Sequence, residues 1–384
     1  MAFIYTYKRS SASRNKNWVW LGGNKMKVLP IKPKKFFCAK NIIGIYCLAA
    51  HFLFPSILIA QSNTRSFEMG LIYWPPASLE GRKDLIEVGI DRTISYSDIM
   101  VAQIPWSAVN TNICQNSQWI ASLAKKHKRR LIIALDWLEP SRKNLRDKKK
   151  YNWTFSDNKI SQRFVFSVLT AIKNCKPDYI LLGVEVNYLA LYNPKEFRAF
   201  LTTFQEARKQ IKNLSPETLI SVSFQYELLA GHDSSRDSPK TIEVLDAFGR
   251  SLDMVGMSIY PHLAGLSPKN LGLHYFNQLK EINQPIGIFE TAWPADDKKG
   301  ESRQSDYLKI LLPKANELGV KLVIWTSSAD TPQPPPKKNK LSNGIPTWAY
   351  DLGLWTLHGN PKEATSTWIN WFLHRLTTTA GNSR

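Results

Sequence analysis

Two glutamates stand at the ends of almost purely apolar runs. Glu185 follows the run 179–184, and Glu290 follows the run 285–289. An acid at the end of a buried strand is costly to desolvate unless it is paired or used. A structural ion pair or a helix cap explains one such acid equally well, but two favour a functional pair. One protonated and one ionised carboxyl group, facing each other, can cleave a glycosidic bond.

The pair needs a scaffold that brings two strand ends together. From Phe67 onward, short apolar runs alternate with amphipathic stretches of helical length, which is typical of a parallel sheet wrapped by helices. Eight strands are predicted, the number that closes a barrel. They cover 68–74, 99–104, 131–137, 179–185, 219–225, 254–260, 286–290 and 322–326.

Helices are predicted between these strands. Apolar residues recur at three- and four-residue spacing in 117–128, 160–174, 194–212, 241–250, 268–282 and 302–318, and a first helix is expected between 79 and 88. No GxGxxG or GxxxxGK[ST] motif follows the first strand, which argues against a doubly wound open sheet. The predicted fold class is therefore α/β, a single (β/α)8 TIM barrel over residues 62–384. Its active site is expected at the carboxyl ends of the strands.

Two motifs and several further stretches carry a family resemblance. The fourth-strand motif is Gly183-Val184-Glu185-Val186-Asn187, and the seventh-strand motif covers 288–293. These two motifs make the chain resemble the clan-A (β/α)8 glycoside hydrolases. The resemblance also includes the stretches 253–262, 323–325 and 353–364. The chain is similar to the arabinogalactan endo-β-1,4-galactanases and related secreted glycosidase families. The resemblance extends from about residue 67 to 371.

The resemblance implies roles for named residues. Glu185 would be the general acid/base and Glu290 the nucleophile, with Tyr260 donating a hydrogen bond to Glu290. Trp325, at the end of the eighth strand, would form the floor under the sugar. The family's Asn before the acid/base, which bonds the sugar 2-hydroxyl, is replaced here by Val184. Asn187 is the candidate replacement if the loop turns.

Further candidates for substrate binding follow from position at or just beyond strand ends: Asp136, Trp137, Gln225, Trp74, His262 and Trp293. The other histidines and the cysteines show neither a catalytic triad nor metal-ligand spacing, so neither a metal nor a cofactor is predicted. A carboxyl separation of about 5 Å would give retention of anomeric configuration, and about 6.5 to 9.5 Å inversion. Retention is the expected outcome.

The N-terminal segment has the pattern of an export signal. Residues 1–60 contain ten Lys and Arg but no Asp or Glu, which accounts for half of the net charge of +20. Four lysines between 32 and 40 precede the uncharged apolar stretch 42–60. Residues 1–61 are therefore predicted to be a basic tail with a signal peptide cleaved after Ala60, or an uncleaved membrane anchor. The barrel would be secreted, periplasmic or anchored outside the cytoplasm.

The remaining charge indicates no nucleic-acid partner, because the basic runs are short and scattered. The expected partner is a poly- or oligosaccharide, with the membrane contacted only through the N-terminal segment, and the chain is expected to be a monomer. The predicted function is an exported glycoside hydrolase that cleaves O-glycosidic bonds with two glutamates. The alternative is a carbohydrate-binding barrel whose catalysis is impaired by Val184.

Overall fold

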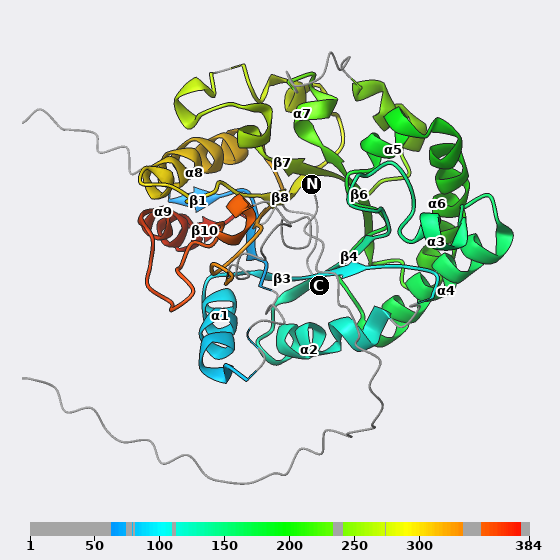
Figure 1. Ribbon diagram of the computed structural model, residues 1–384, viewed down its shortest axis with the longest axis horizontal. Coiled ribbons are helices and arrows are strands. Elements are labelled where there is room, and N and C mark those ends of the chain that lie inside the picture. The colour runs from blue at the N-terminus through cyan, green and yellow to red at the C-terminus, as the bar shows by residue number, and fades with distance from the viewer. Residues whose placement is uncertain are drawn as a thin grey trace, which may run out of the picture. The chain divides into compact units, whose positions relative to one another are not determined.

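Eight parallel strands close into a barrel in the computed structural model, in the order β2-β3-β4-β5-β6-β7-β8-β9 (Figure 1). The structure describes residues 63–73, 79, 81–109, 113–232, 241–272, 274–332 and 347–377. The strands lie within one or a few residues of the predicted runs. They are β2 Glu68–Leu71, β3 Ile99–Pro105, β4 Arg130–Asp136, β5 Tyr179–Leu181, β6 Leu219–Gln225, β7 Met254–Ile259, β8 Ile286–Thr291 and β9 Leu322–Trp325. The predicted TIM barrel is confirmed.

Alternation along each strand divides the apolar residues between two cores. In β3, Ile99 and Val101 belong to a cluster inside the barrel, whereas Met100 and Ala102 belong to the larger cluster between barrel and helices. This follows from the pleat, since successive side chains point to opposite faces of a sheet. The filled interior supports the strand ends where the two glutamates lie.

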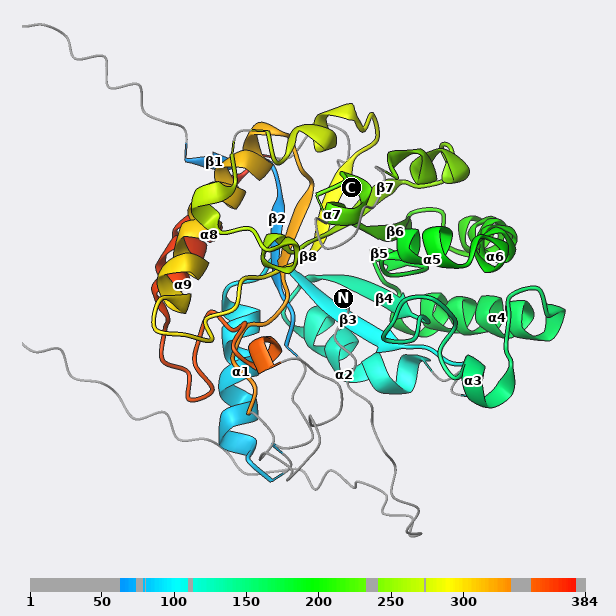
Figure 2. The same ribbon diagram turned by 45° about the horizontal axis from the view of Figure 1, so that its top comes forward.

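Helices surround the barrel on its outer side (Figure 2). The longer ones are α1 Lys83–Ser95, α2 Ile113–Lys126, α4 Asn158–Cys175, α6 Pro194–Leu214, α8 Gly300–Glu317 and α9 Glu363–Phe372. Local sequence explains where they begin. Asp157 caps α4 by accepting a hydrogen bond from the Lys159 amide, and Asn193 caps α6 in the same way ahead of Pro194.

Two of the predicted helices take a different form. The segment 241–250 contains the 3-10 helix η2 Ile242–Phe248, and 268–282 contains two short ones, η4 Pro268–Asn270 and η5 Asn277–Glu281. Gly272 interrupts the second segment, and glycine disfavours a continuous helix. The first helix also starts later than expected, at Lys83.

A small parallel sheet of β1 Thr64–Arg65 and β10 Arg375–Leu376 was not predicted, because two-residue strands leave no sequence pattern. It joins the two ends of the described chain. Arg65 also binds Asp98 through an ion pair with a 2.7 Å N–O separation. The sheet thus links the chain ends to the start of β3.

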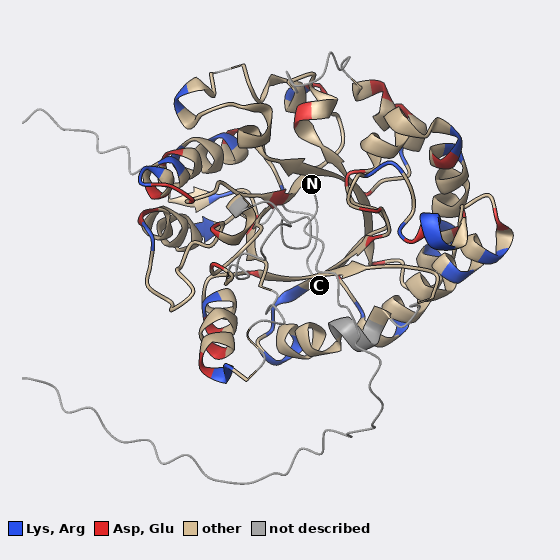
Figure 3. Ribbon diagram, in the orientation of Figure 1, with Lys and Arg blue, Asp and Glu red and all other residues tan. Residues whose placement is uncertain are grey.

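The predicted export segment 1–61 lies outside the described residues, so export stays a prediction. In the described part of the chain, no helix combines the length and apolarity needed to cross a bilayer. Lys and Arg are interspersed with Asp and Glu over the outer helices seen in Figure 3.

The packed barrel interior gives a stability prediction. A Cβ on Gly256 in β7 would lie 2.7 Å from the Val222 backbone oxygen and 2.9 Å from the Phe289 ring. Gly256→Ala should therefore lower the free energy of unfolding by about 1 to 3 kcal/mol. Gly272→Ala, with open space around the added methyl group, should change it by less than about 0.5 kcal/mol. Urea unfolding of both variants measures this, and equal effects would contradict the close packing.

Candidate active site

Both glutamates lie at the carboxyl ends of their strands and are buried. Glu185 is 0% exposed and Glu290 is 4% exposed. Glu185 immediately precedes α5, Val186–Tyr192, and has left-handed backbone angles (φ 53°, ψ 44°). Such angles are unfavourable for a residue with a Cβ and often mark functional sites. The Glu185 amide donates to Ser223 Oγ at 3.1 Å, which helps to hold this turn.

A strand irregularity directs Glu290 inward. In the register of β7 with β8, Met257 pairs with Ile288 and Ser258 with Glu290, so Phe289 is an extra residue. Phe289 belongs to the cluster inside the barrel, and regular alternation would then turn Glu290 outward. The bulge resets the alternation, so Glu290 meets groups at the barrel mouth.

Arg142 links Glu185 to a second buried acid. Its Nε lies 3.1 Å from Glu185 Oε2, and its Nη1 donates to Asp136 Oδ1. Asp136 also pairs with Arg146 Nη2 at 3.3 Å. Arg142, Asp136 and Glu185 are each no more than 2% exposed. Buried charges of this kind require partners, and here two cations match two carboxylates.

Neutral donors hold Glu290. Gln103 Nε2 donates to Glu290 Oε1 at 2.8 Å, and Tyr260 Oη donates to Oε2 at 3.1 Å. The predicted contact from Tyr260 is therefore present. The Tyr260 hydroxyl also lies 2.8 Å from Thr326 Oγ1. Gln103 and Tyr260 come from β3 and the end of β7, so several strands converge on this carboxyl group.

The electrostatics show that the two glutamates affect each other. Burial, followed by the negative charge of Glu185, raises the pKa of Glu290 to about 7. The charges of Arg142 and Asp136 act on it more weakly, in opposite directions. Burial and the Glu290 charge also raise the pKa of Tyr260 well above its usual value, so its hydroxyl keeps its proton as a donor.

A third buried glutamate, Glu227, supports the site through the backbone of Tyr260. Glu227 lies in α7, Tyr226–Leu229, and accepts a hydrogen bond from the Tyr260 amide at 2.7 Å. Tyr275 Oη and Gln225 Nε2 also donate to it. Burial raises the pKa of Glu227 to about 7. This carboxyl group fixes the backbone of Tyr260, whose side chain reaches Glu290.

The structure corrects the proposed use of Asn187. Its Nδ2 donates to the Gln225 carbonyl and its Oδ1 accepts from the Gln225 amide, both at 2.9 Å. Both ends of the amide are used, and the side chain is 0% exposed, so Asn187 does not replace the missing sugar contact. The Gln225 side chain is likewise occupied, by Glu227 and by the Leu228 amide.

The prediction that Trp325 forms the floor under the sugar was wrong. Trp325 belongs to the cluster between barrel and helices, near Tyr307 of α8, and its Nε1 donates to Leu352 O at 2.8 Å. Ile324, the preceding residue of β9, points into the barrel. Because successive side chains of a strand point to opposite faces, Trp325 points outward. Trp137 is also outside the barrel, where it packs on Phe200 and donates to Leu182 O.

The remaining candidates differ in position. Asp136 holds Arg142, as described above. The His262 ring lies 5.7 Å from Trp293 and 4.9 Å from Trp348, measured between centroids. Neither ring nitrogen of His262 has a hydrogen-bond partner among the described residues, and burial lowers its pKa to about 3. His262 is therefore a neutral imidazole and stays a candidate sugar contact. Trp74 lies outside the described residues.

Sequence reasoning missed Gln103, Arg142 and Glu227. Gln103 had a usable signal, since it is a polar residue inside the apolar run of β3. Glu227 follows the end of β6 by two residues. Arg142 had no such signal, because it is one of several basic residues in a loop between β4 and α3, Lys148–Tyr151.

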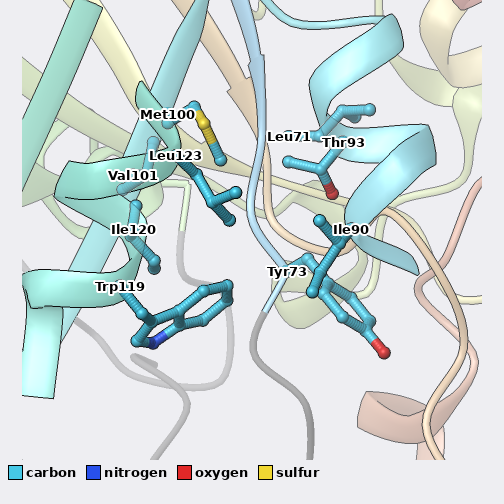
Figure 4. A pocket seen from close by; sticks show the side chains of 9 residues that line it. All are labelled: Leu71, Tyr73, Ile90, Thr93, Met100, Val101, Trp119, Ile120 and Leu123. Atoms are coloured by element: carbon cyan, nitrogen blue, oxygen red, sulfur yellow. The ribbon is translucent and has the colours of Figure 1, made fainter. Parts of the chain in front are cut away.

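Among the described residues, no cluster of three His, Cys, Asp or Glu side chains is arranged to hold a metal ion. A small cavity of about 10 Å³ lies elsewhere, beside α1 and α2 (Figure 4). It has room for about one water molecule. Its lining is mostly apolar and includes neither glutamate: Leu71, Tyr73, Ile90, Thr93, Met100, Val101, Trp119, Ile120 and Leu123.

Comparison with known proteins identifies the fold. No protein-family model and no curated protein sequence matches the chain. Among solved structures, the exo-beta-1,4-mannosidase Op5Man5 from Opitutaceae bacterium strain TAV5 matches with a TM-score of 0.60 and 16% identity. The match covers 80% of this chain but only 59% of that one.

Two further solved structures match over more of their length. A GH5_18 from Bifidobacterium longum subsp. infantis has a TM-score of 0.59 and 14% identity, covering 82% of this chain and 81% of that one. A GH5_18 variant from Streptomyces cattleya, in complex with Manb1-4GlcNAc, has a TM-score of 0.59 and 14% identity, covering 83% of each. None of the three is a galactanase. The chain has the (β/α)8 fold of clan-A glycoside hydrolases.

The raised pKa of Glu290 predicts a pH dependence of stability. The pKa of Glu290 in the folded state is about 7, above the ordinary 4.5. The stabilisation that protonated Glu290 gives the folded state is therefore fully present below pH 4.5 and is lost as the pH rises through 7. The free energy of unfolding should fall across this window by on the order of 3 kcal/mol from this group. Glu290→Gln should flatten the fall in urea unfolding curves. Glu227→Gln should remove a separate part of the fall in unfolding free energy with pH. If Glu290→Gln left the slope of unfolding free energy against pH unchanged, Glu290 would not be the group responsible.

Proposed function

We propose that this protein is a glycoside hydrolase that cleaves O-glycosidic bonds of an oligo- or polysaccharide with Glu185 and Glu290. The observation that carries the proposal is the burial of two carboxyl groups at the ends of β5 and β8. Arg142 lies against Glu185, whereas Gln103 and Tyr260 donate hydrogen bonds to Glu290. The fold shared with glycoside hydrolases supports it.

In the proposed mechanism, the Glu185 carboxyl group gives its proton to the glycosidic oxygen while the Glu290 carboxylate attacks the anomeric carbon. The bond to the leaving sugar breaks and a covalent glycosyl ester forms on Glu290. Water then attacks the same carbon, Glu185 takes a proton from that water, and the ester bond to Glu290 breaks. Two displacements at one carbon give retention of configuration.

Gln103 and Tyr260 serve the nucleophile in this scheme. Both donate to the Glu290 carboxylate, and hydrogen bonds to an ionised carboxyl group favour the ionised form. Because Gln103 donates to Oε1 and Tyr260 to Oε2, they also hold the carboxylate in one orientation. Glu227 holds Tyr260 in place through its backbone amide.

For the substrate, we propose a β-linked saccharide, with β-1,4-linked mannosides as the first to be tested. The proposal draws on the solved structures of similar fold, one of which is an exo-beta-1,4-mannosidase and another of which binds Manb1-4GlcNAc. A panel of β-mannosides, β-glucosides and β-galactosides covers this class, including the galactanase substrates that the sequence resemblance suggests.

The second candidate function is sugar binding without turnover. Val184 supports it, because this residue lies in the apolar cluster inside the barrel and provides no hydrogen bond for a sugar 2-hydroxyl. Loss of that bond removes stabilisation that strengthens in the transition state. The two functions differ in whether products appear.

Replacing either glutamate tests the enzyme. Glu185→Ala and Glu290→Gln should each lower kcat/KM about 10²- to 10⁴-fold while leaving saccharide binding measurable by calorimetry. Glu301→Gln, an exposed acid on α8, is the matched control and should keep full activity. Wild-type protein that binds saccharides but releases no product would favour the binding function. Proton NMR of the first product anomer decides between retention and inversion.

We also propose that the segment 1–61 directs the barrel out of the cytoplasm, on the basis of its lysines and the uncharged stretch 42–60. Fractionation of cells expressing the full chain should place it outside the cytoplasm, and a chain lacking residues 1–61 should remain inside. Equal distribution of the two would contradict the proposal.

A further inference from the structure

The segment after β4 has lysines on its exposed side. Lys143, Lys149 and Lys150 are exposed there, and the neighbouring Tyr151 is 40% exposed. Figure 3 shows α3 as an almost continuous blue segment. Within the described part of the chain, none of these three lysines forms an ion pair with a carboxylate. Unpaired ammonium groups that lie close together on a surface attract anions.

Aromatic rings lie beside these lysines in two stacked pairs. The ring centroids of Tyr151 and Trp153 are 4.4 Å apart, with 17° between the ring planes. Those of Tyr188 and Tyr192 on α5 are 6.3 Å apart, with 8° between the planes. Lys143 Nζ lies 4.5 Å from the centroid of the Tyr192 ring. The loop after β4 and α5 therefore place ammonium groups and flat rings next to each other.

Hydrogen bonds hold this segment in one shape. An antiparallel bridge between Leu138 and Leu145 closes the loop after β4. Glu196, at the start of α6, is 3% exposed. It accepts hydrogen bonds from Thr154 Oγ1 at 2.7 Å and from the Phe155 amide at 2.6 Å. Because the backbone that carries the lysines and rings is already ordered, a ligand that binds there pays little for ordering it.

The same two segments reach the candidate active site. The loop after β4 contains Arg142, which lies 3.1 Å from Glu185, and Lys143 is the next residue. The helix α5, which carries Tyr188 and Tyr192, begins directly after Glu185. In Figures 1 and 2, α3 and α5 lie on the same side of the barrel. A polymer that enters the barrel mouth can therefore continue over these lysines and rings.

We propose that a polysaccharide with carboxylate groups on its sugar rings binds the basic-aromatic surface, which consists of Lys143, Lys149, Lys150, Tyr151, Trp153 and Tyr192. The flat rings contact the C–H faces of the sugars, and the ammonium groups contact the carboxylates. A nucleic acid also combines rings with negative charge. The choice of a saccharide rests on the proposed function of the adjoining site.

Calorimetry of the full chain with β-1,4-linked mannuronate oligomers tests the proposal. Mannan oligomers of the same length and linkage lack only the carboxylates, and they should bind about tenfold more weakly at low salt, a difference that added salt should remove. Equal binding of the two would overturn the role of charge. Poly-L-glutamate, which has carboxylates but no sugar rings, should also bind more weakly than mannuronate. Tighter binding of poly-L-glutamate or of single-stranded DNA would overturn the assignment to a saccharide.

Two pairs of adjacent lysines separate this surface from the total charge of the chain. The double variant Lys149→Gln/Lys150→Gln should weaken mannuronate binding about 3- to 30-fold and leave mannan binding unchanged. The double variant Lys125→Gln/Lys126→Gln removes the same charge from exposed lysines at the end of α2, near the amino end of β4. It should weaken mannuronate binding by less than about twofold. Equal losses in the two variants would overturn the proposal.

Variants of Tyr151 test the aromatic part. Tyr151→Ala should weaken mannuronate binding about 3- to 10-fold, whereas Tyr151→Phe keeps the ring and should bind as the wild type does. Circular dichroism shows whether each variant is folded. Equal binding by Tyr151→Ala and the wild type would overturn the role of the ring. Because the measurement is binding without turnover, a chain that hydrolyses nothing can still give the expected results, so failure of the proposed function is seen separately.

Discussion

The cost of burying carboxyl groups governs the mouth of this barrel. Asp136, Glu185 and Glu290 are almost fully buried at the strand ends, and each unpartnered charge there would cost several kcal/mol. The chain meets this cost in two ways. Arg142 and Arg146 neutralise Asp136 and Glu185, whereas Glu290 receives hydrogen bonds from neutral groups. The difference between these two solutions gives the acids different chemistry.

Much of the fold and the two glutamates could be predicted because of how parallel strands are buried. Strands covered on both faces are nearly continuous apolar runs, so the first charged residue after a run marks the strand end. Glu185 and Glu290 were found in this way. Arg142 could not be, because its position depends on a loop closed by the bridge between Leu138 and Leu145. Its sequence neighbours are equally basic.

The errors at Trp325 and Trp137 share one cause, which is that a strand end does not say which way a side chain points. Trp325 follows an inward Ile324 and therefore faces the helices. By the same rule Glu290 would face outward after the inward Phe289. The bulge in β8 reverses that outcome. A shift of one residue in strand register therefore decides whether the residue after an inward side chain faces the helices, as Trp325 does, or the barrel mouth, as Glu290 does. The pattern of apolar residues in the sequence does not reveal this bulge.

Purely structural roles explain the glutamate pair poorly. A fold gains little from an ion pair at 0–2% exposure, since apolar residues of similar size are often as stable. It gains still less when both partners have left-handed backbones. Val184 provides no polar group beside Glu185, yet Glu185, Glu290 and their donors are buried there. Binding a neutral sugar would require hydrogen-bonding groups but no pair of buried carboxyl groups. Two carboxyl groups in unlike surroundings are what proton transfer to a leaving oxygen requires.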